Sequence, residues 1–231
     1  MSKKLPSGFY DAWEAISKYR EEHKAAVDSM GVHTAADAKA PKDEQDFQTL
    51  FSLMLSSQTK DITNSAVMTE LKSAPDGLTL EVVRKWTEEE LDEKIKKVGF
   101  HRTKAKHIKQ TAELLATQHD GKVPDTLREL IAFPGVGPKM AHLALQICHN
   151  ITVGVSVDTH VHRITNRLGW VKTKTPIETM KDLEDWLPKD CWAEINPLLV
   201  GYGQTVCQPR KPKCDICPAR LWCKEGRKGM K

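Results

Sequence analysis

The stretch that decides the fold is LRELIAFPGVGPKMAHLALQI, residues 127–147. Apolar residues recur at helical spacing on both sides of its centre, which predicts two helices joined by a tight turn. Pro134 ends the first helix, because the residue before a proline avoids helical dihedral angles, and Pro138 suits the first position of the second helix. Gly135 and Gly137 permit a positive φ and a close backbone approach that few other residues allow. We therefore predict a helix-hairpin-helix.

The turn of this hairpin, formed by Gly135, Val136 and Gly137, is predicted to present unpaired backbone N–H groups at a helix N-terminus. Such groups form a site for an anion, because the helix dipole adds to their partial positive charge. A hairpin of this kind can hold a phosphate without reading base sequence.

An amine and a carboxylate follow the turn, Lys139 directly and Asp158 nineteen residues later. Most lysines are surface residues without a special role, but the hairpin in front of Lys139 suggests more. Asp158 is also a candidate N-cap for a helix that begins at residue 159. Both roles are compatible, because a capping carboxylate has a fixed position.

Four of the six cysteines lie within seventeen residues. No stretch resembles a signal peptide, so clustered thiols indicate a metal site rather than disulfides. Structural zinc usually takes Cys-x2-Cys with a second pair further away, whereas here single cysteines flank one such pair at six and five residues. This spacing lets four thiolates surround one compact object, so a [4Fe-4S] cluster is favoured and zinc is the alternative. The candidate ligands are Cys207, Cys214, Cys217 and Cys223.

Composition and charge add few constraints. The 231 residues can bury one sizeable core or two small ones, and no apolar run approaches the ~20 residues of a membrane helix. The net charge of +4 is modest, but a segment over residues 94–109 contains seven Lys/Arg and no acid. A second basic segment starts at residue 203, so we predict a directed positive surface.

Only residues 151–157 have strand character, and one short segment does not make a sheet, which predicts an all-α protein.

The loop between the first two clustered cysteines is basic and contains two prolines. Because metal ligands would fix both of its ends, it could present three cations to phosphate at reduced entropic cost. These cations are Arg210, Lys211 and Lys213.

From about Phe47 to Cys223 the sequence resembles the endonuclease III family of DNA glycosylases. Four elements match in order and separation: LSSQTKD at residues 55–61, the hairpin with Lys139, VDTH at residues 157–160, and the cysteine spacing. Residues 138–141 and 160–163 resemble the eukaryotic branch more than the bacterial one. Phe133 stands where the family usually has leucine.

The resemblance implies residue roles and a reaction. Lys139 would be the nucleophile and Asp158 its essential partner, Gln58 would fill the gap left by a flipped base, and the four clustered cysteines would hold a [4Fe-4S] cluster. The implied activity is base excision of oxidised pyrimidines in duplex DNA, with an associated lyase step through a lysine Schiff base. The flipped base is needed because its sugar carbon is not reachable inside the stack.

The resemblance also implies an organisation. A six-helix domain with the hairpin would span residues 40–151, a cluster domain residues 152–231, and residues 1–39 would pack with the cluster domain. The expected partner is double-stranded DNA containing oxidised pyrimidines or abasic sites, with no membrane, and we expect a monomer. The eukaryotic resemblance implies the nucleus, with mitochondria as a second compartment.

Two other functions remain open at this point. The sister family of adenine-removing glycosylases shares the hairpin, aspartate and cysteine spacing, but it generally lacks the lysine and carries a further C-terminal domain. A non-catalytic iron-sulfur module that binds DNA and senses damage or redox state is the second.

Overall fold

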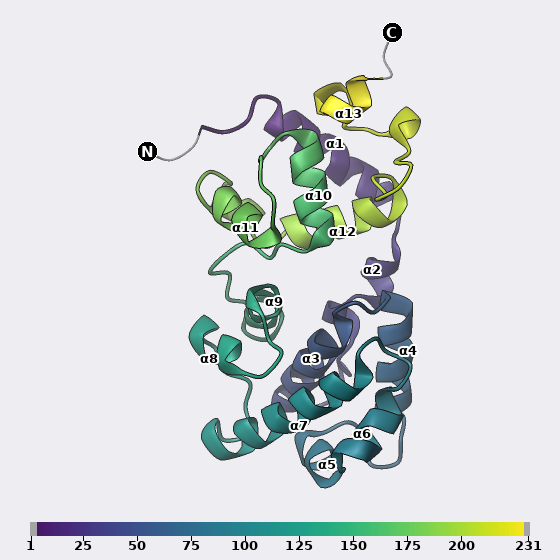
Figure 1. The fold of residues 1–231 in the computed structure, drawn as a ribbon, viewed down its shortest axis with the longest axis vertical. Helices are drawn as coiled ribbons and strands as arrows, with labels where there is room; N and C mark the ends of the chain where they lie inside the picture. Colours follow the sequence, from purple (N-terminus) through teal and green to yellow (C-terminus); the bar gives the residue numbers. More distant parts are fainter. Residues whose placement is uncertain (1–3, 229–231) are drawn as a thin grey trace. The chain divides into compact units, whose positions relative to one another are not determined.

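The computed structural model describes residues 4–228, and within this range the chain is helical throughout, with no strand (Figure 1). The prediction of an all-α protein is confirmed. The stretch at residues 151–157 with strand character is an extended connector that pairs with no other strand in the described chain. No helix among the described residues is long and apolar enough to cross a membrane.

The chain divides into two compact units, one of them formed by Ser29–Val153. The described part of the other consists of residues 4–28 and 154–228. Helix α2 (Ala26–Met30) spans the boundary between them. The unit at residues 29–153 contains η1 (Val32–Thr34), α3 (Lys42–Ser56), α4 (Asp61–Lys72), α5 (Leu80–Lys85), α6 (Glu88–Ile95), α7 (His101–Gln118), α8 (Leu127–Ala132) and α9 (Pro138–His149).

Helix α3 is the centre of this unit, and α4, α7 and α9 pack against it. Its residues 46–55 are all buried, so the helix has no solvent-facing stripe over that length. Its buried polar side chains have partners, as an interior requires. The Gln48 amide accepts from Asp37 N at 2.7 Å and donates to Leu78 O at 3.1 Å, and Asn64 of α4 donates to Ser52 O at 3.1 Å.

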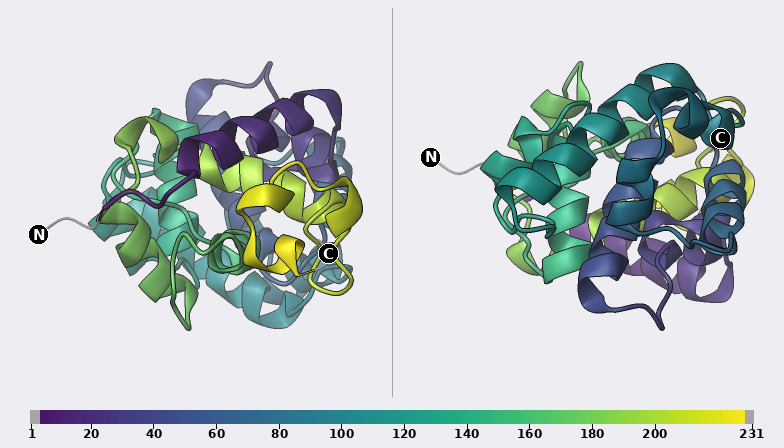
Figure 2. Two further views of the ribbon diagram at one scale, coloured as in Figure 1. Left: turned by 90° about the horizontal axis from the view of Figure 1, so that it is seen from above. Right: turned by 90° about the horizontal axis from the view of Figure 1, so that it is seen from below.

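The second unit contains α1 (Phe9–Glu22) and the helices from α10 to α13, so segments from before and after the first unit share one core (Figure 2). The Phe9 ring lies edge-on to Trp170 at 4.8 Å and to Trp186 at 5.3 Å. Helix α1 also packs against α12. The C-terminal elements are α10 (Thr159–Leu168), α11 (Pro176–Glu184), η2 (Lys189–Cys191), α12 (Ile195–Thr205), η3 (Cys214–Ile216), η4 (Arg220–Trp222) and α13 (Lys224–Arg227).

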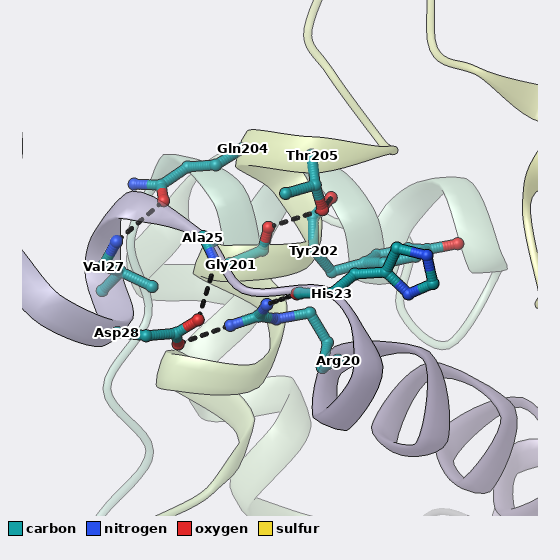
Figure 3. Close-up of polar contacts among 9 residues, drawn as sticks. All are labelled: Arg20, His23, Ala25, Val27, Asp28, Gly201, Tyr202, Gln204 and Thr205. Atoms are coloured by element: carbon teal, nitrogen blue, oxygen red, sulfur yellow. Dashed lines mark hydrogen bonds and ion pairs between the residues drawn. The ribbon is translucent and has the colours of Figure 1, made fainter.

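A partly buried ion pair joins α1 to α2, and Val27 N of α2 donates to Gln204 Oε1 of α12 at 3.1 Å (Figure 3). The Arg20 guanidinium donates to Asp28 Oδ1 at 2.6 Å, and Asp28 Oδ2 accepts from Ala25 N at 2.7 Å. Burial alone would raise the pKa of Asp28, but the Ala25 N–H and the Arg20 guanidinium hold it below its usual range. A Cβ at Gly201 would lie 2.1 Å from Arg20 Nη2, so any other residue there would displace the Arg20 guanidinium.

Candidate active site

The predicted hairpin is present, as α8, a turn over residues 133–137, and α9. Gly135 has φ +77°, and a Cβ built there would lie 2.5 Å from His107 Nδ1 of α7. Glycine is therefore needed at this position for both conformation and space. Gly137 differs, because its φ of −93° suits any residue and open space surrounds the position of its missing Cβ.

The amides of the turn are not all available to a ligand. Val136 N–H donates to Phe133 O at 3.1 Å, so the expectation of an unpaired N–H is wrong for Val136. The Val136 side chain is also buried in the core of the unit. The N–H groups of Gly135 and Gly137 donate to no acceptor within residues 4–228. The anion site that the turn offers is thus smaller than expected.

Phe133, in place of the family's leucine, anchors the hairpin rather than disturbing it. Its side chain is buried, and its ring stands edge-on to His119 at the end of α7, with centroids 5.5 Å apart. The larger side chain is accommodated because it completes the core under α8 and α9.

Lys139 occupies the first turn of α9, directly after Pro138 at its first position, and its side chain is half-buried. An ammonium there is opposed by the helix dipole, whose positive end lies at the N-terminus. The lysine thus stands immediately behind the turn that offers the Gly135 and Gly137 amides.

Asp158 belongs to the other unit and is the N-cap of α10, so the capping role expected from the sequence is confirmed. Its Oδ1 accepts hydrogen bonds from His160 N and Val161 N, both at 2.8 Å. Its Oδ2 receives no hydrogen bond from any described residue. One oxygen is therefore used to fix the carboxylate, and the other stays available.

Gln58 lies just after α3, exposed and in the left-handed region at φ +51°. It lines one pocket of the unit at residues 29–153 together with Gly135 of the hairpin turn, so two of the predicted DNA contacts share a pocket. The remaining lining residues are Met54, Ser57, Phe100, Thr103, Lys104 and His107.

The pocket includes an aromatic residue that sequence reasoning missed. Phe100 is 63% exposed and has φ +57°, directly before the first residue of α7. A large exposed aromatic in a left-handed conformation is unusual, which marks it for a role outside the core. The sequence signal was slight: an aromatic residue after Gly99 at the start of a basic helix.

The basic segment at residues 94–109 does not form the predicted positive surface. Lys94 lies over the Trp86 ring, while Lys96 and Lys97 form ion pairs with Glu93 and Glu70. Lys109 donates to backbone oxygens of α5, and Lys104 is buried. Most of this positive charge is therefore used within the unit, and only Arg102 and Lys106 remain as exposed cations without a described partner.

Lys104 is the least expected member of the pocket. Its side chain reaches under the Gln58 segment, and Nζ donates to Leu55 O and Ser57 O, both at 2.6 Å, and to Thr59 Oγ1 at 3.0 Å. Burial lowers the pKa of Lys104 to about 8. No carboxylate among the described residues pairs with it.

The four clustered cysteines line one small cavity, together with Arg167, Val206, Pro212, Lys213, Glu225 and Gly226. Hydrogen-bond donors surround the sulfurs: Arg167 Nη1 donates to Cys207 Sγ at 3.4 Å, and the Tyr202 hydroxyl lies 2.8 Å from Cys217 Sγ. Burial raises the pKa of the Cys217 thiol. No three Cys, His, Asp or Glu side chains within residues 4–228 stand close enough to hold a single metal ion.

Two arginines of α10 hold the start of the basic loop. Arg163 Nη2 donates to Cys207 O at 2.8 Å, and Arg167 donates to Gln208 O at 2.7 Å and Pro209 O at 2.8 Å. The three cations of the loop, Arg210, Lys211 and Lys213, remain exposed. The helix that Asp158 caps therefore also positions the predicted phosphate-binding loop.

Comparison with known proteins gives the class. A family described as "HhH-GPD superfamily base excision DNA repair protein" matches residues 51–189, more than half of the chain. "Endonuclease III-like protein 1" of Gallus gallus is 49% identical over 221 residues, which cover 92% of this chain and 78% of that protein. "Endonuclease III homolog 1, chloroplastic" of Arabidopsis thaliana is 44% identical over 226 residues, covering 94% and 59%.

Solved structures agree. A trapped endonuclease III–DNA covalent intermediate has a TM-score of 0.79 and 26% identity, over 96% of this chain and 98% of that one. A non-covalent endonuclease III–DNA complex has a TM-score of 0.80 and 26% identity, over 96% and 95%. The fold and site thus define a base excision DNA repair protein with a helix-hairpin-helix. Within that class, the chain belongs to the endonuclease III family. The predicted resemblance, glycosylase fold and repair function are confirmed.

Proposed function

We propose that this chain removes oxidised pyrimidines from duplex DNA and then cleaves the abasic strand through a Schiff base on Lys139. The observation that supports this most directly is the place of Lys139, in the first turn of α9 and directly after the glycine turn. A phosphate held by the turn amides would bring the neighbouring sugar to the amine.

The reaction needs a neutral amine. A free lysine with a pKa near 10.4 has only about one part in 2,500 neutral at pH 7. The N-terminal end of α9 disfavours the ammonium form and raises that fraction. The amine attacks C1′ and the N-glycosidic bond breaks, so that the base leaves with a proton. The C1′–O4′ bond then opens, a proton passes from the nitrogen to O4′, and the lysine imine forms. The imine favours loss of a C2′ proton, the 3′ phosphate leaves, and water then releases the lysine.

Asp158 would stabilise the positive charge that develops on the sugar. Two N–H bonds to Oδ1 fix the carboxylate, so it need not reorganise during the reaction, and Oδ2 is left to face the sugar or to carry a proton. A carboxylate would favour the ammonium form of Lys139, so we assign Asp158 to charge and proton handling rather than to activating the amine.

Four groups of residues would contact the DNA. The amides of Gly135 and Gly137 would hold a phosphate, with Val136 acting only by burying the turn. Gln58 would fill the gap left by the flipped base, and the exposed ring of Phe100 in the same pocket would stack on a neighbouring base. Arg210, Lys211 and Lys213 would bind phosphate further along the strand.

The four clustered cysteines would hold a [4Fe-4S] cluster. The donors fit, because all four thiols line one cavity and four thiolates are the ligand set that such a cluster takes. When bound it supplies a rigid framework for the basic loop.

We further propose a monomer that acts on lesions and abasic sites in double-stranded DNA in the nucleus, with mitochondria as a second compartment. One relative from Arabidopsis is named as chloroplastic.

Borohydride trapping on DNA that contains thymine glycol tests the proposal. Wild-type protein should form a covalent adduct, and Lys139→Gln should form none and should not cleave the strand, while still binding the duplex. Lys18→Gln, on the exposed face of α1, is the control and should behave as wild type. Trapping by Lys139→Gln would exclude Lys139 as the nucleophile. A wild-type protein that released adenine without trapping would indicate the sister activity, and one that only bound DNA would indicate a sensor.

A further inference from the structure

Lys104 carries a charge in an environment where lysines are rare. It is 6% exposed, and no described carboxylate pairs with it. A buried cation is costly unless its donors are satisfied. All three N–H donors of Lys104 are used, and all three acceptors lie in one five-residue segment, residues 55–59. The cost of burial is thus offset by a single structure, the segment that carries Gln58.

The acceptors show what the lysine does locally. The last carbonyls of α3 have no partner within the helix. Ser56 Oγ donates to Leu53 O at 2.7 Å, and Thr59 N donates to Ser56 O at 3.2 Å. Lys104 Nζ donates to Leu55 O, which lies between Leu53 and Ser56 in the sequence, and to Ser57 O, just after the end of α3. A cation at a helix C-terminus is also favoured by the helix dipole.

The segment needs this support because Gln58 is strained. A non-glycine residue at φ +51° persists only when its surroundings fix it. Lys104 holds both neighbours of Gln58, through the Ser57 carbonyl and the Thr59 hydroxyl. Gly99 adds a steric limit, since a Cβ there would lie 2.8 Å from Gln58 O.

The same face of α7 touches the other parts of the pocket. Lys104 and His107 lie one turn apart on α7, Phe100 is the N-cap residue just before this helix, and His107 packs against the Gly135 turn. One helix face therefore holds the Gln58 segment, the exposed ring and the hairpin turn in a fixed arrangement.

We propose that Lys104 is a positioning residue for the excision reaction, one that holds residues 55–59 in the conformation in which Gln58 enters the duplex. The proposal rests on the function proposed above. It predicts a defect confined to DNA with an opposite strand, because a single strand leaves no gap for Gln58 to fill.

The test compares Lys104→Met with a matched control, Lys109→Met. Lys109 lies on the same helix and donates in the same way to Val83 O and Arg84 O of α5, away from the pocket. Strand cleavage is measured on a duplex with an abasic site and on the same strand alone. In Lys104→Met the duplex kcat/KM should fall about tenfold, a coupling of ~1.4 kcal/mol, while single-strand cleavage is kept. Lys109→Met should change neither.

A double-mutant cycle shows whether Lys104 acts through Gln58. If it does, Lys104→Met combined with Gln58→Ala should be no slower on the duplex than Gln58→Ala alone. Amide exchange of Gln58 and Thr59 should be faster in Lys104→Met and unchanged in Lys109→Met. Equal losses on duplex and single strand, additive effects, or unchanged exchange would overturn the proposal. A wild type that cleaved neither substrate would overturn the proposed function instead, and exchange would still decide whether Lys104 orders the segment.

Discussion

Two loops of this protein, in different units, are held by cations that reach backbone oxygens from a neighbouring helix. Lys104 of α7 holds residues 55–59, and Arg163 and Arg167 of α10 hold residues 207–209. The first loop is held by hydrogen bonds between protein atoms alone. The second also ends in the cavity lined by four thiols, where a cluster would add its own bonds. The comparison teaches that side chains alone can order a short loop beside a large core, whereas the cysteine loop would take part of its order from the proposed cluster.

The largest expected effect comes from a substitution that should disorder only the second loop. Cys217→Ser should lose most of the bound iron and sulfide, and protease should then cut within residues 207–223, because the loop has lost its anchor. Cys191→Ser, a buried cysteine outside the cavity, is the control and should keep the iron content of wild type. Iron analysis and limited proteolysis measure both. Full iron in Cys217→Ser, or stoichiometric zinc in wild type isolated without oxygen, would refute the cluster.

Asp158 lies at the start of the helix that holds the second loop, so its charge can be separated from its capping role. Asp158→Asn keeps an oxygen for the His160 and Val161 amides but removes the negative charge. We expect turnover to fall by about 10²–10³, as for other preorganised stabilisers, with little change in the melting temperature. Single-turnover kinetics and thermal unfolding measure the two. Near-normal turnover would leave Asp158 only as a helix cap.

The pH dependence of the free energy of unfolding should reveal the contribution of Lys104, which holds the first loop. Because burial lowers the pKa of Lys104 to about 8 from 10.5, the unfolded chain binds more protons between these values, and stability rises with pH there. The gain should be at most about 3 kcal/mol, absent in Lys104→Met. Cys148 and Cys191 act oppositely, since burial raises their pKa to about 12 and about 11. The difference between wild type and Lys104→Met, from urea unfolding at pH 7 to 10, isolates Lys104. A flat difference would contradict the shift.

The smallest expected effect concerns the two glycines beside the first loop. Gly135→Ala should destabilise the protein by about 1–3 kcal/mol, because it forces a side chain into a positive φ and against His107. Gly137→Ala should change stability by less than about 0.5 kcal/mol, since φ is ordinary and space is open. Chemical denaturation of both variants measures this. Equal losses would mean that the turn differs from the one described.

The sequence predicted those features that depend on neighbouring residues. Proline and glycine placed the hairpin turn, Asp158 was anticipated as a cap, and the thiol spacing anticipated one cavity. It could not show that Val136 N–H is used within the turn, or that Lys104 lies under a segment 45 to 49 residues away. Both depend on tertiary contacts. The seven cations of residues 94–109 were expected to contribute to a positive surface, because Glu70, which pairs with Lys97, and the carbonyls that bind Lys109 lie elsewhere in the sequence.

The core shared by residues 4–28 and 154–228 affects the order in which the two units can fold during synthesis. Residues 4–28 leave the ribosome before the other unit, but their partners begin at residue 154, after the 125 residues of that unit. At about 5–20 residues per second, that delay is roughly 6–25 s. Throughout it, Phe9 lacks Trp170, and Arg20 lacks the glycine face of α12. The unit at residues 29–153 can fold during the wait, so this protein should reach its native state from the middle of its sequence outward.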